Sequence, residues 1–279
     1  GLFLSTRENI FTMRSLTESL QNFVESIIHW MHAAYDFNPA AVEVAFGTEH
    51  DPHGPWILPL DDAHRMLFRG KIDRIDLAVD AASGQIWCVV IDYKSRSRRI
   101  DPVLMTNGVQ IQLPSYLAVV CQLESLKQTL GVESLLPAGV FYVSLRGEFK
   151  GGKNRAEVLA DADQVRKKAF AHSGRFNLGA LSLLDRQAGN GGSGQFSYRV
   201  TAKGRPDKKF ADLLDPDRFE EMLRLVEQRL KEMGRRIFQG QIAIDPYLKG
   251  QTACQHCDYQ SICRIDPWTH RFRVLKKES

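Results

Sequence analysis

Apolar side chains recur every three or four residues early in the chain and every second residue further on. Between residues 7 and 36 this spacing predicts an amphipathic helix, with apolar positions at Phe11, Leu16, Leu20, Phe23, Ile27 and Met31. Strands are expected at 41–46, around 65–69 and at 137–145, the last apolar enough to lie centrally in a sheet. Further helices are expected at about 108–128 and from Asp215 and Pro216 to Gly240. This order favours an α/β fold in which helices flank a mixed central sheet.

Two stretches depart from this regular pattern. Residues 150–210 are polar and rich in glycine, especially at 189–194, and we expect an irregular insertion there. Residues 250–265 form a cysteine-rich segment near the end of the chain. We interpret residues 1–279 as a single domain, since 279 residues suit one large domain or two small ones.

The segment from Gly70 to Lys94 is predicted to form a β-hairpin. Two arms rich in β-branched residues, 70–79 and 86–94, flank a turn-like stretch that contains aspartate, serine and glycine. If Val79 pairs with Ile86, the register places Asp73 directly opposite Asp92. Because side chains alternate between the two faces of a strand, Asp92 and Lys94 share one face with Cys88 and Val90.

Two carboxylates and an ammonium at the end of an apolar face need a cause, because ionisable groups are rare there unless paired or bound to a metal. A single aspartate at a strand end, neutralised by Lys94, would need no further explanation. For the set of Asp73, Asp92 and Lys94 we expect a divalent metal, Mg²⁺ or Mn²⁺, held by the two aspartates. Such an ion acidifies bound water and neutralises phosphate charge. Lys94 can orient that water or stabilise the transition state.

An aspartate on one strand followed by Asp-x-Lys on the next resembles the PD-(D/E)xK nuclease superfamily. The stretches 70–76 and 92–95 look like its RecB-family branch. Gln112 and Tyr116 then match the Gln-x-x-x-Tyr signature of that branch, and on a helix they project from the same side. The resemblance implies that these two residues line the DNA-facing rim of the metal site. It implies a nuclease domain whose catalytic residues are Asp73, Asp92, Lys94, Gln112 and Tyr116.

The C-terminal part narrows the resemblance to the nuclease domain of AddB-type subunits of bacterial helicase–nucleases. Cys254, Cys257 and Cys263 have the spacing found there, and stretches at 42–47, 137–144 and 237–246 are also similar. In that family a fourth, upstream cysteine completes a [4Fe–4S] cluster. No cysteine precedes Asp73 in this chain, which also begins at Gly1 without the family's upstream helix. We therefore interpret the chain as a C-terminal fragment of a larger subunit and expect the cluster to be incomplete or absent in it.

Several alternatives for the remaining cysteines and histidines stay open. Zinc could replace iron if His256 or His270 completed four ligands, or the three clustered thiols could be free. Cys88 and Cys121 are expected to be packing residues. His29 and His32, on the first helix, could replace the family's upstream histidine, but a surface or interface role is the simpler interpretation for both.

Composition and charge are compatible with a DNA partner. The chain has a net charge of +4, and its five cysteines argue against a secreted disulfide framework and for a reducing, bacterial cytoplasm. No run reaches membrane-spanning length, and no phosphate-binding loop for ATP is present. Arg96, Arg98 and Arg99 directly follow the metal motif and are expected to bind DNA.

The resemblance implies a role in processing double-strand-break ends for recombinational repair, with a helicase partner subunit that delivers single-stranded ends. Two other functions stay open at this point. One is a stand-alone exonuclease of the Cas4 type, and the other is an inactive DNA-binding or scaffold module.

Overall fold

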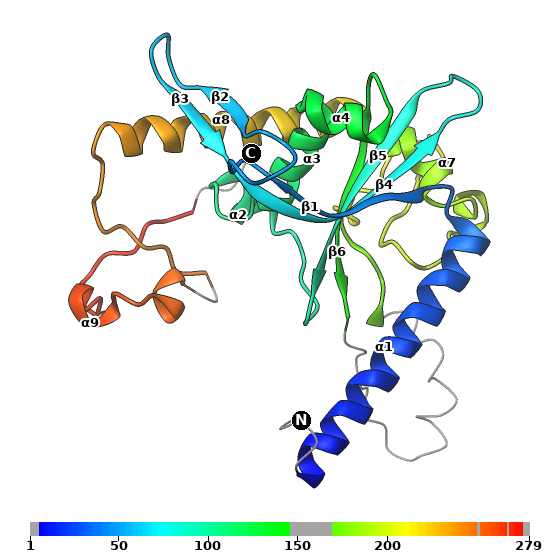
Figure 1. The fold of residues 1–279 in the computed structure, drawn as a ribbon, viewed down its shortest axis with the longest axis horizontal. Coiled ribbons are helices and arrows are strands. Elements are labelled where there is room, and N and C mark those ends of the chain that lie inside the picture. Colours follow the sequence, from blue (N-terminus) through cyan, green and yellow to red (C-terminus); the bar gives the residue numbers. More distant parts are fainter. Residues whose placement is uncertain (1–5, 146–168, 250–251, 267, 276–279) are drawn as a thin grey trace.

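A six-stranded mixed sheet forms the centre of the molecule (Figure 1). This computed structural model describes residues 6–145, 169–249, 252–266 and 268–275. The strand order is β1 (Asn38–Phe46), β4 (Gly70–Val79), β5 (Ile86–Lys94), β6 (Leu136–Ser144), β7 (Ser173–Asn177) and β8 (Leu213–Leu214). The β5–β6 and β7–β8 pairs are parallel, and the others are antiparallel. The predicted mixed sheet with flanking helices is thus confirmed, and β6 lies inside the sheet as expected.

The β4–β5 hairpin has the predicted register. Val79 pairs with Ile86, and the ladder continues to Arg74 opposite Ile91. The next step along both strands brings Asp73 and Asp92 to the same level. A second, two-stranded sheet made of β2 (Trp56–Pro59) and β3 (Arg65–Phe68) lies beside it. Of this small sheet, only the strand near 65–69 was predicted.

One face of the central sheet is covered by α3 (Gln112–Gln122) and α8 (Pro216–Phe238), with α2 (Pro102–Thr106) and α4 (Glu124–Leu130) beside them (Figure 1). Their apolar side chains pack onto Cys88, Val90 and Val140 of β5 and β6. Burying these side chains removes apolar surface from water and is the main stabilising force. The crossover α2–α3–α4 is also what allows β5 and β6 to run parallel.

The single helix expected at about 108–128 is wrong, because the chain is interrupted at both ends of α3. Gly108 adopts a positive φ of 78°, which ends the preceding turn. Leu123 is extended, with φ −81° and ψ 107°, and separates α3 from α4. The predicted start and end of α8 are confirmed: Pro216 occupies its first turn, and Gly240, at φ 72°, follows its last residues.

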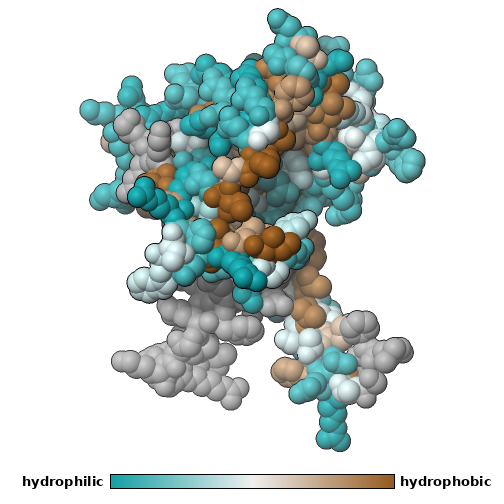
Figure 2. Space-filling view, turned by 90° about the vertical axis from the view of Figure 1, so that its left-hand side faces the viewer, coloured by the Kyte–Doolittle hydropathy of each residue, from teal (hydrophilic) through white to brown (hydrophobic). Residues whose placement is uncertain are grey.

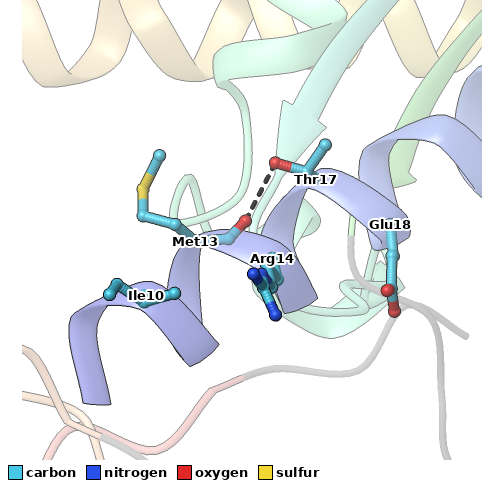
Figure 3. A pocket seen from close by; sticks show the side chains of 5 residues that line it. All are labelled: Ile10, Met13, Arg14, Thr17 and Glu18. Carbon is cyan, nitrogen blue, oxygen red and sulfur yellow. Dashed lines mark hydrogen bonds between the residues drawn. The ribbon is translucent and has the colours of Figure 1, made fainter. Parts of the chain in front are cut away.

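The other face of the sheet is covered by α1 (Arg7–Ala34), but only along the second half of that helix. Phe23, Ile27, Trp30 and Ala34 are buried against Val89, Ile91 and Phe141. The first half extends away from the sheet (Figure 1), and Phe11 is 73% exposed. A shallow hollow lies along this half, lined by Ile10, Met13, Arg14, Thr17 and Glu18 (Figure 3). It contains no predicted site residue.

The described part of the stretch at 150–210, residues 169–210, contains short regular elements that the sequence pattern did not predict. This part contributes β7 to the sheet and continues through η2 (Leu178–Ala180), α7 (Leu181–Leu184) and η3 (Ala188–Asn190). The glycine-rich stretch folds around buried Asp185, whose carboxylate accepts hydrogen bonds from Ser193 N, at 2.8 Å, and from the Tyr198 hydroxyl, at 3.0 Å. Residues 150–168 of the expected insertion lie outside the described residues.

Beyond α8 the chain forms η4 (Ala253–His256) and α9 (Gln260–Cys263). None of the residues described between 241 and 275 is buried. Large apolar side chains are exposed at the end of α8 and after it, including Phe238, Ile242 and Ile244. Figure 2, which views the molecule from the side of this end of α8, shows apolar areas interrupting a hydrophilic surface.

Candidate active site

Asp73 and Asp92 lie on neighbouring strands at the end of the β4–β5 ladder. The Tyr93 backbone N–H donates a 2.9 Å hydrogen bond to Asp73 Oδ2 and so connects the two strands at this point. Asp92 is 6% exposed. Burial raises the pKa of the Asp92 carboxyl, the neighbouring Asp73 raises it further, and Lys94 opposes both. The two aspartates thus lie on neighbouring strands at the same end of the ladder, and their sharing of one cation stays a prediction.

Lys94 forms an ion pair with Asp92, and its Nζ lies 5.6 Å from the centre of the Tyr142 ring. Both side chains therefore lie on one side of the sheet, as the period of two predicts. The oxygen of Asp92 that pairs with Lys94, Oδ2, is buried. A buried carboxylate oxygen is costly without a cation, and here the Lys94 ammonium supplies the positive charge.

These features fit a hard divalent cation. Among the residues that the structure describes, no group of three or more histidine, cysteine, aspartate or glutamate side chains could hold a metal. Zinc and calcium usually take more protein ligands than two, whereas Mg²⁺ keeps several waters and accepts one or two carboxylates. The buried Asp92 carboxylate and the neighbouring Asp73, which repel each other, supply the negative charge that such an ion neutralises.

Gln112 and Tyr116 occupy one side of α3, as predicted. Gln112 Nε2 donates a 3.0 Å hydrogen bond to the Tyr116 hydroxyl. The Tyr116 ring covers the start of β4 so closely that a Cβ at Gly70 would lie 2.9 Å from its Cε1 atom. The structure therefore explains why residue 70 is a glycine: the Tyr116 ring occupies the space that a side chain there would need. The role of Gln112 and Tyr116 at a DNA-facing rim stays a prediction.

The three arginines after β5 are exposed. Arg98 Cζ lies 5.3 Å from the centre of the Tyr142 ring, and its charge lowers the pKa of the Asp92 carboxyl. These arginines lie on residues 95–100, which we call the arginine loop. The last residue of this loop is held in place by Arg175, whose Nη2 atom donates a 3.0 Å hydrogen bond to the Ile100 carbonyl. Arg175 itself is buried and paired with Asp212 at 2.7 Å.

Tyr142 is a site residue that the sequence analysis did not identify. It pairs in register with Asp92 across the parallel β5–β6 junction, and both Lys94 and Arg98 lie over its ring. Burial raises the pKa of its hydroxyl, while Arg98 lowers it and Asp92 raises it. The aromatic face attracts both cations and holds them beside Asp92. The apolar strand at 137–145 was recognised, but its alignment with β5 depends on a long crossover that no local pattern reveals.

The cysteines form two separate groups. Cys88 and Cys121 are packed together in the core, with their Sγ atoms 3.5 Å apart, so their predicted packing role is confirmed. The Cys121 thiol and burial raise the pKa of Cys88. Within the described part of the chain, Cys254, Cys257 and Cys263 do not converge into a metal-binding group. For exposed ligands without a packed core, metal binding supplies the free energy that gathers them. Their role as cluster ligands stays a prediction.

His29 and His32 are exposed on α1, which covers the face of the sheet opposite α3 and α8. Neither joins the aspartates in a metal-binding group within the described residues. Also among these residues, no helix is both long and apolar enough to cross a membrane.

This geometry agrees with the comparison of the chain with known proteins. The profile of the PD-(D/E)XK nuclease superfamily matches residues 4–264, so the chain belongs to that superfamily. Individual relatives are named as a subunit of an ATP-dependent helicase/deoxyribonuclease. The protein from Symbiobacterium thermophilum is 30% identical over 273 residues, which are 95% of this chain and 22% of the relative. The protein from Bacillus pumilus is 28% identical over 285 residues, 99% of this chain and 23% of the relative. The chain thus spans less than a quarter of the length of these relatives.

Proposed function

We propose that this chain is a metal-dependent DNA nuclease domain that hydrolyses phosphodiester bonds. The observation that carries the proposal is the buried Asp92 carboxylate beside Asp73 on the neighbouring strand, with Lys94 paired to Asp92 on the same face. Membership of a nuclease superfamily supports it. Asp73 and Asp92 would hold Mg²⁺ or Mn²⁺, which supplies an acidified water and neutralises phosphate charge when bound.

The residues of the chain then have distinct tasks. Asp73 is oriented by the Tyr93 backbone N–H, and Asp92 is fixed by its place in the middle of the sheet. Lys94, which pairs with Asp92 here, would donate hydrogen bonds to the attacking water or to the developing charge on phosphate. Arg98, held over the Tyr142 ring, and the neighbouring Arg96 and Arg99 bind the DNA backbone.

The proposed substrate is the single-stranded DNA end, cut by exonuclease action. Relatives named as subunits of an ATP-dependent helicase/deoxyribonuclease support this. In that setting a helicase partner subunit delivers the strand, and the complex processes double-strand-break ends for recombinational repair.

We test this function with the purified protein and an end-labelled linear single strand. With Mg²⁺ or Mn²⁺ we expect cleavage, and EDTA should abolish it. Asp92→Asn or Lys94→Ala should lower the rate by about 100- to 1,000-fold, because each removes a charge at the reacting phosphate. DNA binding should be largely unchanged in both variants. The matched control is Asp62→Asn, which removes an exposed carboxylate remote from the predicted site residues in sequence and should leave the rate unchanged.

Each outcome separates the candidate functions. Wild-type cleavage by the Lys94 variant removes Lys94 from the mechanism. DNA binding without cleavage by the wild type favours a scaffold module. A circular single strand should resist the enzyme, and its cleavage would indicate an endonuclease instead.

We further propose that Cys254, Cys257 and Cys263 ligate a [4Fe–4S] cluster. Their spacing supports this, but three thiolates are one short of the usual four, so a fourth ligand must come from outside this group. Iron and sulfide analysis of the chain, beside a version extended upstream, tests the proposal. Stoichiometric iron and sulfide only in the extended version is the expected result. Stoichiometric zinc would overturn it, and a complete cluster in the chain alone would assign the fourth ligand within it.

A further inference from the structure

A charged network lies on the opposite face of the sheet, directly behind the two aspartates. Arg74 follows Asp73 and Tyr93 follows Asp92, so the alternation of the strands directs both side chains toward α1. There, Arg74 Nη1 donates a 3.1 Å hydrogen bond to the Tyr93 hydroxyl, and Tyr93 packs edge-on against Phe23 of α1, with ring centres 6.1 Å apart.

Arg74 is held in place by a buried carboxylate. Its Nε and Nη2 atoms donate to the two oxygens of Asp76 at 2.6 and 2.7 Å, which is a bidentate pair. Asp76 is fully buried and also accepts a 3.1 Å hydrogen bond from the Tyr35 hydroxyl. A guanidinium bound at both ends in this way has little freedom to rotate. Its remaining nitrogen is therefore aimed at Tyr93 by a rigid support.

The network lies at the point along β4 and β5 where the pairing of these two strands ends. The paired ladder between β4 and β5 ends at Arg74 opposite Ile91. Beyond this pair, β4 stays paired with β1 as far as Gly70, and β5 stays paired with β6 as far as Lys94. Asp73 and Asp92 thus face each other where their two strands stop pairing, and their like charges repel. Something must hold the strands together at this point.

We propose that Arg74 and Tyr93 are positioning residues, which hold Asp73 and Asp92 at the separation that a shared cation requires. The Arg74–Tyr93 hydrogen bond links the ends of β4 and β5 on the face toward α1. The hydrogen bond from the Tyr93 backbone N–H to Asp73 links them on the side of the aspartates. Tyr93 therefore takes part in both links. This inference rests on the proposed nuclease function for its catalytic meaning, but the positioning itself can be tested by metal binding alone.

The network itself offers a matched pair of variants. Tyr93→Phe and Tyr35→Phe each remove one phenol hydroxyl from the same cluster and keep the aromatic ring. Only Tyr93→Phe breaks the link across the strands, because Tyr35 contacts Asp76 and not Tyr93 through its hydroxyl. A purely structural role would make the two variants equivalent. Arg74→Lys is a third variant, which keeps the charge but loses the bidentate geometry.

The measurement is the affinity for Mn²⁺, followed by the loss of the free-ion signal in electron paramagnetic resonance, beside urea unfolding. Tyr93→Phe should weaken Mn²⁺ binding about five-fold, the equivalent of one hydrogen bond, and lower kcat with little change in the KM for DNA. Arg74→Lys should do the same or more. Tyr35→Phe should lower the free energy of unfolding about as much as Tyr93→Phe does, but it should bind Mn²⁺ with wild-type affinity. Equal Mn²⁺ affinities for both phenylalanine variants would overturn the proposal.

The failure of this proposal can be distinguished from the failure of the proposed function. If the wild type binds Mn²⁺ but does not cleave DNA, the nuclease function fails, and the contrast between the two variants still decides the positioning role. If the wild type does not bind millimolar Mn²⁺, both proposals are overturned.

Discussion

The β4–β5 hairpin and the segment from residue 241 to 275 both carry residues assigned to a metal, but they differ in what fixes them. The hairpin lies inside the sheet, with Ile75 and Val90 fully buried on its strands. Of the residues described between 241 and 275, none is buried, and Trp268 is 94% exposed. The geometry of the first region is determined by packing before any ligand binds. The second region contains ligand types at suitable spacing but has no core of its own to bring them together.

The same kind of sequence motif therefore carries different structural information in the two places. In the hairpin, the proposed ligands lie on strands whose apolar residues are buried, and this burial sets the direction of the side chains. In the cysteine-rich segment, the expected ligands are surrounded by exposed side chains, and the metal must supply the order. This difference predicts how aromatic deletions, acid, a Cβ added at a crowded glycine, and salt each affect the molecule.

The largest expected effect is a difference in stability between equivalent aromatic deletions. Phe141→Ala removes a fully buried ring of β6 and should lower the free energy of unfolding by about 3–5 kcal/mol. Trp268→Ala removes an exposed ring and should change it by less than about 0.5 kcal/mol. Urea unfolding of the metal-free protein measures both. Similar losses in the two variants would show that the C-terminal segment packs in the folded state.

The second effect is a loss of core stability in acid. His172 is buried beside Phe141 and Trp30, and burial, with a smaller contribution from Arg74, lowers its pKa from 6.5 to about 3. Between about pH 3 and pH 6.5, the His172 imidazole is protonated in the unfolded chain and neutral in the folded one. Its contribution to the free energy of unfolding is therefore fully present above pH 6.5 and is lost as the pH falls toward 3, at up to about 1.4 kcal/mol for each pH unit. Unfolding measured across this range should show the slope, and His172→Gln should reduce it. An unchanged slope in that variant would assign the acid sensitivity to other groups.

A smaller effect is expected where the two nuclease motifs touch. Gly70→Ala would place a Cβ 2.9 Å from the Tyr116 ring and 3.1 Å from the Phe46 ring. Because both rings are held by packing, we expect a loss of about 1–3 kcal/mol in the free energy of unfolding. Gly54→Ala is the control, since no atom lies within 4 Å of its added Cβ. Thermal unfolding compares the two, and equal stabilities would mean that the Tyr116 ring moves aside freely.

The smallest effect concerns the arginine loop. Arg98→Ala should weaken DNA binding at low salt and reduce the slope of log affinity against log salt by about one, because one phosphate contact is lost. Arg14→Ala on the exposed half of α1 serves as the control and should leave the slope unchanged. Fluorescence anisotropy with a labelled single strand at several salt concentrations measures both. An unchanged slope for Arg98→Ala would place the DNA path elsewhere.

Much of the hairpin could be predicted because its information is local. Alternating apolar positions and a turn-forming stretch are enough to align Val79 with Ile86, and the faces of Asp92 and Lys94 follow. The strand containing Tyr142 was also predicted, but its pairing partner was not, since a crossover of three helices separates it from β5. Arg74 and Asp76 stood inside a recognised motif, yet their mutual pairing depends on α1 covering them.

Other differences between the predicted and the observed structure, in β7 and in α1, also have physical causes. β7 was missed because its five residues include a glycine and lie in a polar, glycine-rich stretch. That glycine, Gly174, lies where a Cβ would collide with the Val140 carbonyl at 1.8 Å, so close approach to β6 selects it and weakens the strand pattern. The first half of α1 has the apolar spacing of a buried helix, although Phe11 and Leu16 are exposed. Periodicity indicates which face of a helix is apolar but not what covers it.

The mixed pairing of β5 has a consequence for the order in which the chain folds. Its antiparallel partner is close in sequence, with Val79 opposite Ile86, whereas its parallel partner brings Trp87 to Leu136. Closing a short loop costs less entropy than closing a long one, so we expect the hairpin to form first and the parallel pair to wait for the crossover. During synthesis, Asp73 and Asp92 would then come together before Tyr142 has left the ribosome. The two carboxylates would meet early, and the aromatic platform for Lys94 would arrive last.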